Sequence, residues 1–424
     1  MLTIENDETS ALLKNSIIEG FVTPAYQGQC ISNLPDTFAS LLGLKSNRPL
    51  SDKRFYDFAE KSSIENVVFL LLDGFGFNSI QYVKQNFGFP SFEKLGQDSQ
   101  ILPLTSVFPS TTSTATTSLH TGLTPQEHGI IGYTMYMNEI GAIAQMLDLG
   151  PVFSRRSLFE LGFDPAKLIG KKTLHERFGE SGVPSNLYIN KYIVGSGLSQ
   201  ITNRGANIFP ALTASDLFVG VRRNLESASN GATFHFAYYA SPDTIAHARS
   251  PLSQEYAAEV EAIFYGINRE LREKLDPTVA KKTILIISAD HGLCHIDERE
   301  IIDIASHGEL LNMLKVPPTG DSRCLILHAK SEEKISQIQD YFKTRFGGMF
   351  HLLDSKDALR QGLFGIGEIK EQVLDRIGDL IAVPKKNNAV DNSNVQPRND
   401  YVPGRHGGLA ANEMIVPLIT TRLA

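Results

Sequence analysis

The sequence predicts an α/β protein, a three-layer sandwich in which helices cover both faces of a mostly parallel central sheet, with smaller insertions. Two apolar runs, 67–72 and 284–289, are followed directly by Asp73 and Asp290. Continuous apolar runs of this length are typical of strands buried on both faces of a parallel sheet. Strand-like and helix-like segments then alternate along the chain, which favours the same architecture. With 424 residues, 42% of them hydrophobic, the chain is long enough for one large core.

The elements of the main core are expected in chain order, separated by turn-forming residues. They are strand 66–73, a strand near 100–107, a helix from 112, strand 233–239, helix 252–275, strand 283–289 and a last strand around 415–420. Residues 1–62 are expected to form an N-terminal extension packed on the core, in which a helix starting at Leu34 stops near Gly43.

Two further segments interrupt this core, which is expected over residues 63–322 and 366–424. Periodicity weakens over 133–212, a candidate insertion. Residues 323–365 predict a small inserted α+β cap, because a strand, a polar helix from Ser331 and a second strand follow one another. The polar stretch 384–400 is expected to be a loop.

Charge and cysteine content limit the partners and the compartment. A net charge of −7 and a pI near 5.9 disfavour nucleic acid as a partner, since such surfaces are usually basic. Cys30, Cys294 and Cys324 are odd in number and far apart, which favours a reduced, cytoplasmic protein over a disulfide framework. Residues 1–8 lack the features of a signal peptide and no run is long enough to span a membrane, so no membrane partner is expected.

A motif of the form D-x-x-x-H follows strand 233–239. Ser241 is expected to cap a helix whose first turn holds Pro242, which places Asp243 and His247 four residues apart on one face. One metal ion could bind both side chains. The alternative is an aspartate that favours the helix dipole and a histidine on the surface.

Other candidate ligands follow strands or lie in glycine-rich turns. Asp73 precedes Gly74, and Asp290 precedes His291, at the strand ends where open α/β sheets bind ligands. His406 lies between Gly404 and Gly408. For each of them the alternative is an ordinary turn or loop.

The segment 110–118 is rich in serine and threonine and has poor helix propensity. If it is helical, packing or a bound anion must stabilise it, and its start would favour a phosphate group and an ionised hydroxyl. Composition does not choose the nucleophile among five candidates, Ser110, Thr111, Thr112, Ser113 and Thr114. The alternative is a small-residue helix packed on the sheet.

Five ordered segments together resemble the type I phosphodiesterase/nucleotide pyrophosphatase family of the alkaline phosphatase superfamily. They are Leu71-Leu72-Asp73-Gly74, Phe108-Pro109-Ser110-Thr111-Thr112 with the following 121–130, Pro242-Asp243-Thr244-Ile245-Ala246-His247, Asp290-His291-Gly292 and His406-Gly407-Gly408. The resemblance implies an alkaline-phosphatase-like catalytic core with a two-zinc site, Mn²⁺ being the alternative metal. It also implies that Thr112 is the nucleophile.

By the same resemblance, one zinc would bind Asp243, His247 and His406. The other would bind the remaining four residues: Asp73, Thr112, Asp290 and His291. Imidazole and carboxylate ligands suit zinc, and two neighbouring cations can stabilise the attacking and leaving oxygens of an in-line displacement. The implied activity is hydrolysis of a small phosphodiester or nucleotide pyrophosphate through a phospho-threonine. His120, His128 and His295 are expected to be structural.

One departure from the family leaves the substrate class open. In the family that the chain resembles, an asparagine usually lies three residues after the nucleophile, where its amide helps bind the phosphoryl oxygen, and this chain has Ala115. Backbone N–H groups or a side chain from an insertion would have to replace it. The alternatives are a phosphomonoesterase or phosphonate hydrolase on the same fold, and a metal-bound protein without catalytic activity.

Overall fold

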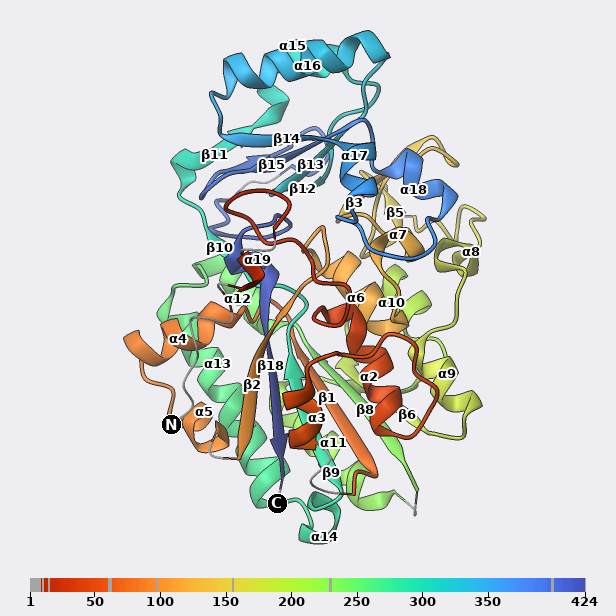
Figure 1. Ribbon diagram of the computed structural model, residues 1–424, viewed down its shortest axis with the longest axis vertical. Helices are drawn as coiled ribbons and strands as arrows, with labels where there is room; N and C mark the ends of the chain where they lie inside the picture. The colour runs from red at the N-terminus through yellow and green to blue at the C-terminus, as the bar shows by residue number, and fades with distance from the viewer. Residues whose placement is uncertain are drawn as a thin grey trace.

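The computed structural model describes residues 9, 11–13, 16–59, 63–96, 98–154, 156–228, 231–397 and 400–423. Expectations about residues 1–8 therefore lie outside the described part, as do Arg398 and Asn399 of the expected polar loop. Figure 1 shows a large twisted sheet flanked by helices and, beyond one end of its strands, a second sheet.

The main sheet has seven strands in the order β2-β18-β9-β1-β8-β6-β7. Only β18 runs antiparallel to its neighbours, so the sheet is mostly parallel. The strands are β1 (Asn66–Leu72), β2 (Ser99–Thr105), β6 (Ser185–Asn190), β7 (Asn207–Ala211), β8 (Thr233–Tyr239), β9 (Thr283–Ser288) and β18 (Ile415–Arg422). The predicted fold class and the predicted core strands are confirmed.

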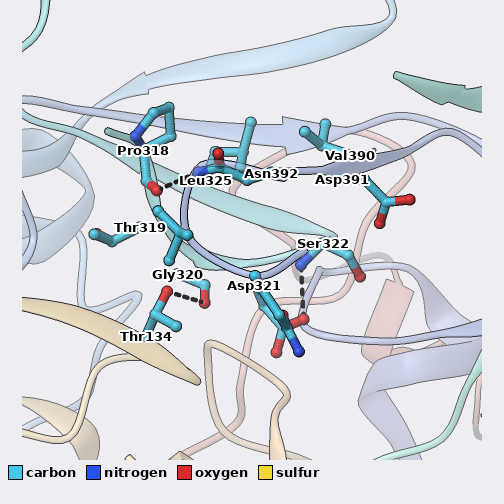
Figure 2. A pocket seen from close by; sticks show the side chains of 12 residues that line it. Thr134, Pro318, Thr319, Gly320, Asp321, Ser322, Leu325, Val390, Asp391 and Asn392 are labelled. Atoms are coloured by element: carbon cyan, nitrogen blue, oxygen red, sulfur yellow. Dashed lines mark hydrogen bonds between the residues drawn. The ribbon is translucent and has the colours of Figure 1, made fainter. Parts of the chain in front are cut away.

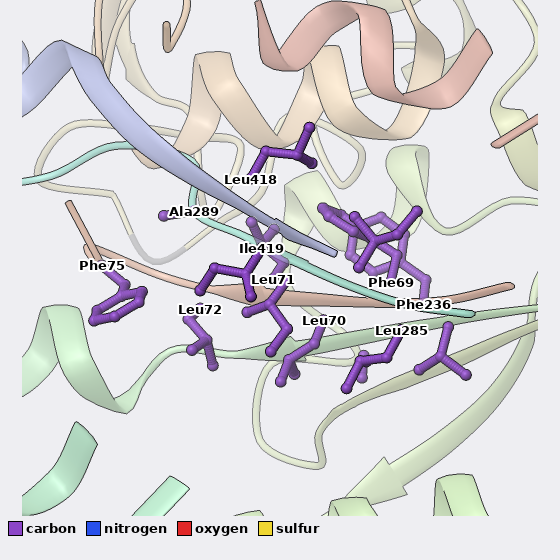
Figure 3. Packing of buried hydrophobic residues seen from close by; sticks show 14 of the residues in the cluster. Phe69, Leu70, Leu71, Leu72, Phe75, Phe236, Leu285, Ala289, Leu418 and Ile419 are labelled. Carbon is purple, nitrogen blue, oxygen red and sulfur yellow. The ribbon is translucent and has the colours of Figure 1, made fainter. Parts of the chain in front are cut away.

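Helices cover both faces of this sheet, as the apolar composition of its strands requires. Figure 3 shows Phe69 and Phe236 on one side of the sheet and Leu70, Leu72 and Leu285 on the other. The Phe69 side packs against the first set of helices: α2 (Leu34–Leu41), α6 (Thr112–Thr121) and α9 (Leu174–Glu180). A second set covers the opposite side: α5 (Pro90–Gly96), α11 (Ala214–Ser227) and α13 (Gln254–Ile267).

The N-terminal extension packs on the core in its described part. It contains η1 (Ile31–Asn33), α2 and α3 (Lys53–Ala59). Phe38 of α2 lies 4.8 Å from Phe69 and 5.3 Å from Phe234, measured between ring centroids. The extension therefore contributes to the main hydrophobic core and not only to its surface.

The second sheet is antiparallel throughout and has the order β14-β15-β13-β12-β3-β4-β5. Its strands are β3 (Thr134–Met137), β4 (Ala142–Gln145), β5 (Gly150–Pro151), β12 (Thr319–Asp321), β13 (Cys324–Leu327), β14 (Phe350–Asp354) and β15 (Leu380–Pro384). One face packs against α16 (Glu332–Arg345), which with α15 (Gly308–Met313) lies at the far end of the molecule in Figure 1.

The two segments expected as insertions contribute differently to these sheets. Residues 323–365 form the expected strand, helix and strand, β13, α16 and β14. Residues 133–212 divide between the sheets, because β3 to β5 lie in the second sheet whereas β6 and β7 extend the main one. The strands β6 and β7 were not recognisable as core because β7 is a mostly exposed edge strand with little apolar periodicity.

The remaining elements are short segments that lie between the strands and helices described above. Two small ladders join β10 (Cys294–His295) to β17 (Gly404–Arg405) and β11 (Ile301–Asp303) to β16 (Ala389–Asp391), so the expected polar loop contains a short strand. The connecting helices are α4 (Phe77–Asn86), α7 (Pro125–His128), α8 (Pro165–Ile169), α10 (Gly197–Thr202), α12 (Ser241–Arg249), η2 (Asn268–Glu273), α14 (Pro277–Ala280), η3 (Glu298–Glu300), η4 (Ile304–Ser306), α17 (Ser355–Arg360), α18 (Glu371–Arg376) and α19 (Ala411–Met414). None of the described helices is long and apolar enough to cross a membrane.

Candidate metal centre

Side chains from five separate segments meet at the carboxyl ends of β1, β8 and β9. Asp73 follows β1 directly, and Asp290 and His291 follow β9 after one intervening residue. Asp243 and His247 lie in α12, which begins two residues after β8. Parallel strands end at the same edge of a sheet, so three distant parts of the sequence converge there.

Asp73, Asp290 and His291 form the first group of candidate ligands. His291 Nε2 lies 3.5 Å from Asp73 Oδ1 and 3.4 Å from Asp290 Oδ2, and all three side chains are buried. Thr112 is the first residue of α6 and lies beside this group, with its Oγ1 3.1 Å from His291 Nε2. The structure therefore brings together the four residues predicted for one ion.

Asp243, His247 and His406 form the second group. Asp243 Oδ2 lies 3.3 Å from His247 Nε2, and Asp243 Oδ1 lies 3.9 Å from His406 Nε2. Ligand atoms of Asp243, His406 and His291 lie within 4.8 Å of one another, and the His291 and His406 rings stack at 3.8 Å. The two groups are thus contiguous, with His291 between them.

The three histidines are oriented in the same way. Their Nδ1–H groups donate to backbone carbonyls: His247 to Gly404 (2.7 Å), His291 to Gly292 (3.1 Å) and His406 to Ser110 (3.1 Å). A carbonyl oxygen only accepts, so each ring is the tautomer whose Nε2 carries a free lone pair. Histidines that bind metals are commonly oriented in this way.

The carboxylates give the clearest sign that the site suits cations. Asp73 Oδ1, Asp243 Oδ1 and Asp290 Oδ2 are buried and have no hydrogen-bond partner among the described residues. Burial, followed by repulsion from Asp290 and Asp243, raises the pKa of Asp73 well above its usual range. Burial, followed by repulsion from Asp243, raises the pKa of Asp290 to about 7. Divalent cations bound by these oxygens would offset the cost of burying charged carboxylates and the repulsion between them. The residues therefore fit a metal centre.

The protein holds these ligands with side chains that the sequence alone did not single out. The Tyr238 hydroxyl donates to Asp73 Oδ2, and backbone N–H groups of Gly74 and His291 donate to Asp290 Oδ1. Tyr238 lies at the carboxyl end of β8, and its partner could not be predicted from its position in the sequence.

Helix α6 is stabilised locally despite its composition. The hydroxyls of three threonines each donate a hydrogen bond to the backbone carbonyl four residues earlier: Thr116, Thr117 and Thr121. These buried hydroxyls therefore have hydrogen-bond partners within the helix. Gly122 ends the helix in the left-handed conformation. The packing of Ala115 and Leu119 in the main core is one of the two stabilising factors expected for this helix, and a bound anion is the other. In α12 the expected cap is wrong, because Ala240 is the N-cap and Ser241 is already helical.

Ala115, where the family resemblance implies an asparagine, has a fully buried side chain in the main core. This side chain offers no donor to a phosphoryl oxygen, so backbone N–H groups or a side chain from an insertion remain the expected replacements. From the segment 133–212, Leu147 and Tyr133 line the space beside the site. The Tyr133 hydroxyl accepts a hydrogen bond from Gln145 Nε2.

The other histidines do not join the site. His120 Nδ1 lies 3.0 Å from His175 Nε2, and His128 Nε2 lies 3.1 Å from Ser118 Oγ, both in buried networks. His295 Nδ1 lies 3.0 Å from Ser250 Oγ. Their hydrogen bonds support the expected structural role.

A pocket of about 420 Å³ opens onto the second group of ligands. Its lining combines residues of both sheets: Thr111, Thr112, Tyr133, Leu147, Asp243, His247, Asp321, Ser322, Gln396, Val402 and His406. A smaller neighbouring pocket, drawn in Figure 2, shares Asp321 and Ser322 with it but contains none of the candidate ligands. The second sheet thus forms a wall of the site.

A buried ion pair supports the loop that presents His406. Arg323 and Glu413 are both fully buried and form two hydrogen bonds of 3.0 and 2.8 Å. Glu413 also accepts from the backbone N–H groups of Gly408 (2.9 Å) and Ala410 (3.2 Å). In the same loop, a Cβ at Gly404 would lie 2.3 Å from the Ala246 carbonyl oxygen, so α12 and the loop approach closely only because this residue is glycine.

We expect Arg323→Ala to lower the free energy of unfolding by about 3–5 kcal/mol, because Glu413 would remain buried without its cationic partner. Urea denaturation would measure the change. The matched control is Arg360→Ala, whose ion pair with Asp357 is exposed and should contribute less than about 1 kcal/mol. Equal losses in the two variants would contradict this account of the loop.

Comparison with known proteins agrees with this geometry. The sequence model of the family described as "Type I phosphodiesterase / nucleotide pyrophosphatase" matches residues 67–409, which include all seven candidate residues. The chain belongs to this family. No curated protein matches the sequence.

Solved structures show the same fold at low sequence identity. Murine ectonucleotide pyrophosphatase/phosphodiesterase 5, an inactive form in complex with AMP, is 17% identical over 83% of this chain and 87% of that one, with a TM-score of 0.60. Phosphonoacetate hydrolase from Sinorhizobium meliloti, in complex with phosphonoformate, is 16% identical over 85% and 90%, with a TM-score of 0.63. The fold is therefore alkaline-phosphatase-like, and the family supports a hydrolase of the phosphodiesterase or pyrophosphatase type.

Proposed function

We propose that this family member hydrolyses phosphodiester or nucleotide pyrophosphate bonds at a two-zinc site, through a covalent intermediate on Thr112. The observation that carries the proposal is the position of Thr112 Oγ1, 3.1 Å from His291 Nε2, at the start of α6 and beside three buried carboxylates. A nucleophilic hydroxyl needs such a position to ionise and to meet phosphorus.

The residues divide into two ligand sets in this proposal. Asp243, His247 and His406 would hold one ion, and Asp73, Thr112, Asp290 and His291 the other. When bound, the two ions supply positive charge that stabilises both the attacking and the leaving oxygen. Zinc suits this mixture of imidazole and carboxylate ligands, and Mn²⁺ is the alternative.

The chain's own residues account for the rest of the reaction. Thr112 Oγ1 forms a bond to phosphorus while the ester bond to the leaving alcohol breaks, and the alcohol takes up a proton from water. Water then hydrolyses the threonine ester. The N-terminal N–H groups of α6 can donate hydrogen bonds to the phosphoryl oxygens, and Tyr133 lines the same pocket.

Charge favours a diester over a monoester. Three carboxylates and the ionised Thr112 hydroxyl balance the charge of two divalent ions, and the described lining of the pocket contains no lysine or arginine. A diester carries one negative charge, whereas a monoester dianion would gain from further cations.

We expect kcat/KM for bis-p-nitrophenyl phosphate, or for a p-nitrophenyl nucleotide ester, to exceed that for p-nitrophenyl phosphate in one buffer containing zinc. Thr112→Ala, purified in parallel, controls for contaminating phosphatases. A kcat/KM for p-nitrophenyl phosphate more than tenfold above that for the diesters would contradict the diesterase proposal and favour a phosphomonoesterase. Tenfold corresponds to about 1.4 kcal/mol in transition-state stabilisation.

A further inference from the structure

Asp321 places a fixed negative charge in the wall of the active-site pocket. It ends β12, and its Oδ1 accepts a hydrogen bond of 2.7 Å from the backbone N–H of Ser322. Its Oδ2 has no protein partner among the described residues, and the side chain is only partly buried. Figure 2 shows Asp321 pointing away from Leu325 and Asn392, which line the neighbouring small pocket.

The backbone around His406 fixes Asp321 beside the second group of ligands. A Cβ at Gly407 would lie 2.7 Å from Asp321 Cβ, so the residue after His406 packs directly against this aspartate. Asp321 also lines the pocket together with Asp243, His247 and His406, whereas Asp73 and Asp290 do not line it. The carboxylate therefore lies in the pocket that opens onto the second group of ligands.

In the proposed reaction the leaving group lies in this pocket, beside the second group of ligands. In an in-line displacement the leaving oxygen departs opposite the nucleophile, and Thr112 belongs to the other ligand group. A substituent on the leaving alcohol would extend into the pocket past Asp321.

The described lining of the pocket contains no lysine or arginine that could balance this charge. Arg323 and Arg405, which adjoin the lining residues Ser322 and His406 in the sequence, are buried in ion pairs with Glu413 and Asp391. Tyr133, Leu147 and Val402 supply apolar surface in the same pocket. The combination suits a short alkyl chain that ends in a positive charge, and an aromatic ring can also attract such a group.

We propose that Asp321 is a specificity residue, and that the site prefers phosphodiesters whose leaving alcohol carries an amine. The inference rests on the proposed function and adds the substrate class. The wall disfavours leaving groups that carry a carboxylate or a second phosphate, since a like charge would face Asp321. In the step itself the P–O bond to the amino alcohol breaks as the bond to Thr112 Oγ1 forms.

Three diesters with a common methyl group test this preference: methyl 2-aminoethyl, methyl propyl and methyl carboxymethyl phosphate. Formation of methyl phosphate is followed by ³¹P NMR with zinc present. We expect kcat/KM for the amine ester to exceed that of the similarly sized propyl ester about tenfold or more, and the carboxymethyl ester to be the poorest substrate. The propyl ester serves as the internal reference for every variant.

In Asp321→Asn, the ratio of amine to propyl ester should fall to within about threefold, and in Asp321→Lys the carboxymethyl ester should overtake the amine ester. Asp340→Asn, an exposed site on α16, is the matched control and should keep the wild-type ratio. Thermal denaturation verifies that each variant is folded, and Asp321→Asn, which keeps the shape of the side chain, suffices if Asp321→Lys is unstable.

The result separates two kinds of failure. If the wild-type protein cleaves bis-p-nitrophenyl phosphate but shows no preference for the amine ester, or if Asp321→Asn keeps that preference, the role of Asp321 is refuted while the proposed function stands. If neither the methyl diesters nor bis-p-nitrophenyl phosphate is cleaved, the proposed function itself fails.

Discussion

Thr112→Ala is expected to lose at least about 10³-fold in turnover while it still binds metal. The substitution removes the attacking atom, and of the candidate ligands only one oxygen. The neighbouring Asp73, Asp290 and His291 remain in contact with one another, so the ion that they would share should stay bound. Steady-state kinetics on a p-nitrophenyl nucleotide ester, with metal analysis of the same sample, measures both quantities.

Thr111→Ala is the control for this prediction. Thr111 lines the same pocket, but as the N-cap residue of α6 it lies one position before the nucleophile, and its loss should lower turnover less than about tenfold. If Thr111→Ala were the inactive variant and Thr112→Ala the active one, the assignment of the nucleophile would be off by one residue.

His406→Ala and Asp290→Ala are expected to lower the metal content from about two ions per chain to about one, each by emptying a different ligand set. Activity should fall in both variants, because each ion stabilises one of the two reacting oxygens. Elemental analysis of protein purified without chelators gives the stoichiometry. His128→Ala is the control, since His128 is buried in a separate network with Ser118.

Chelation should also lower the metal content and the activity of the wild-type protein. Removal of metal would leave one buried oxygen of each of three carboxylates without a partner, so both activity and the melting temperature should fall, and zinc or manganese should restore them. A wild-type protein that contains no metal, and that neither zinc nor manganese activates, would rule out the proposed centre.

Much of the fold was predictable because the main sheet is built from strands with unusually clear patterns. Strand β1 is apolar along most of its length and fully buried, and β9 behaves in the same way. Each is followed by an aspartate at the ligand-binding edge of the sheet, so the fold class and part of the site came from the same segments.

Other elements could not be predicted because their residues are placed by tertiary contacts. The strand β7 is exposed and lies at the edge of the sheet, which leaves it without an apolar pattern. Tyr238 and Glu413 act through partners far away in the sequence, Asp73 and Arg323, so no local motif indicates them. The wall of the pocket was hidden for the same reason, since Tyr133 and Asp321 meet the site only after the second sheet has formed.

The register of α6 shows the limit of local reasoning most clearly. Five hydroxyl residues in a row are equivalent by composition, yet only Thr112 is within hydrogen-bond distance of His291. Ser113 and Thr114 instead bond to the backbone of Gly132. Helix geometry, which the sequence does not specify to one residue, separates the candidate nucleophile from its neighbours.

The stereochemical course at phosphorus tests the central claim most directly. A chiral phosphorothioate diester, hydrolysed in ¹⁸O-labelled water, should give a product with retained configuration, because attack by Thr112 and then by water produces two inversions. A product with inverted configuration would mean that water attacks phosphorus directly, and it would contradict the covalent intermediate on Thr112.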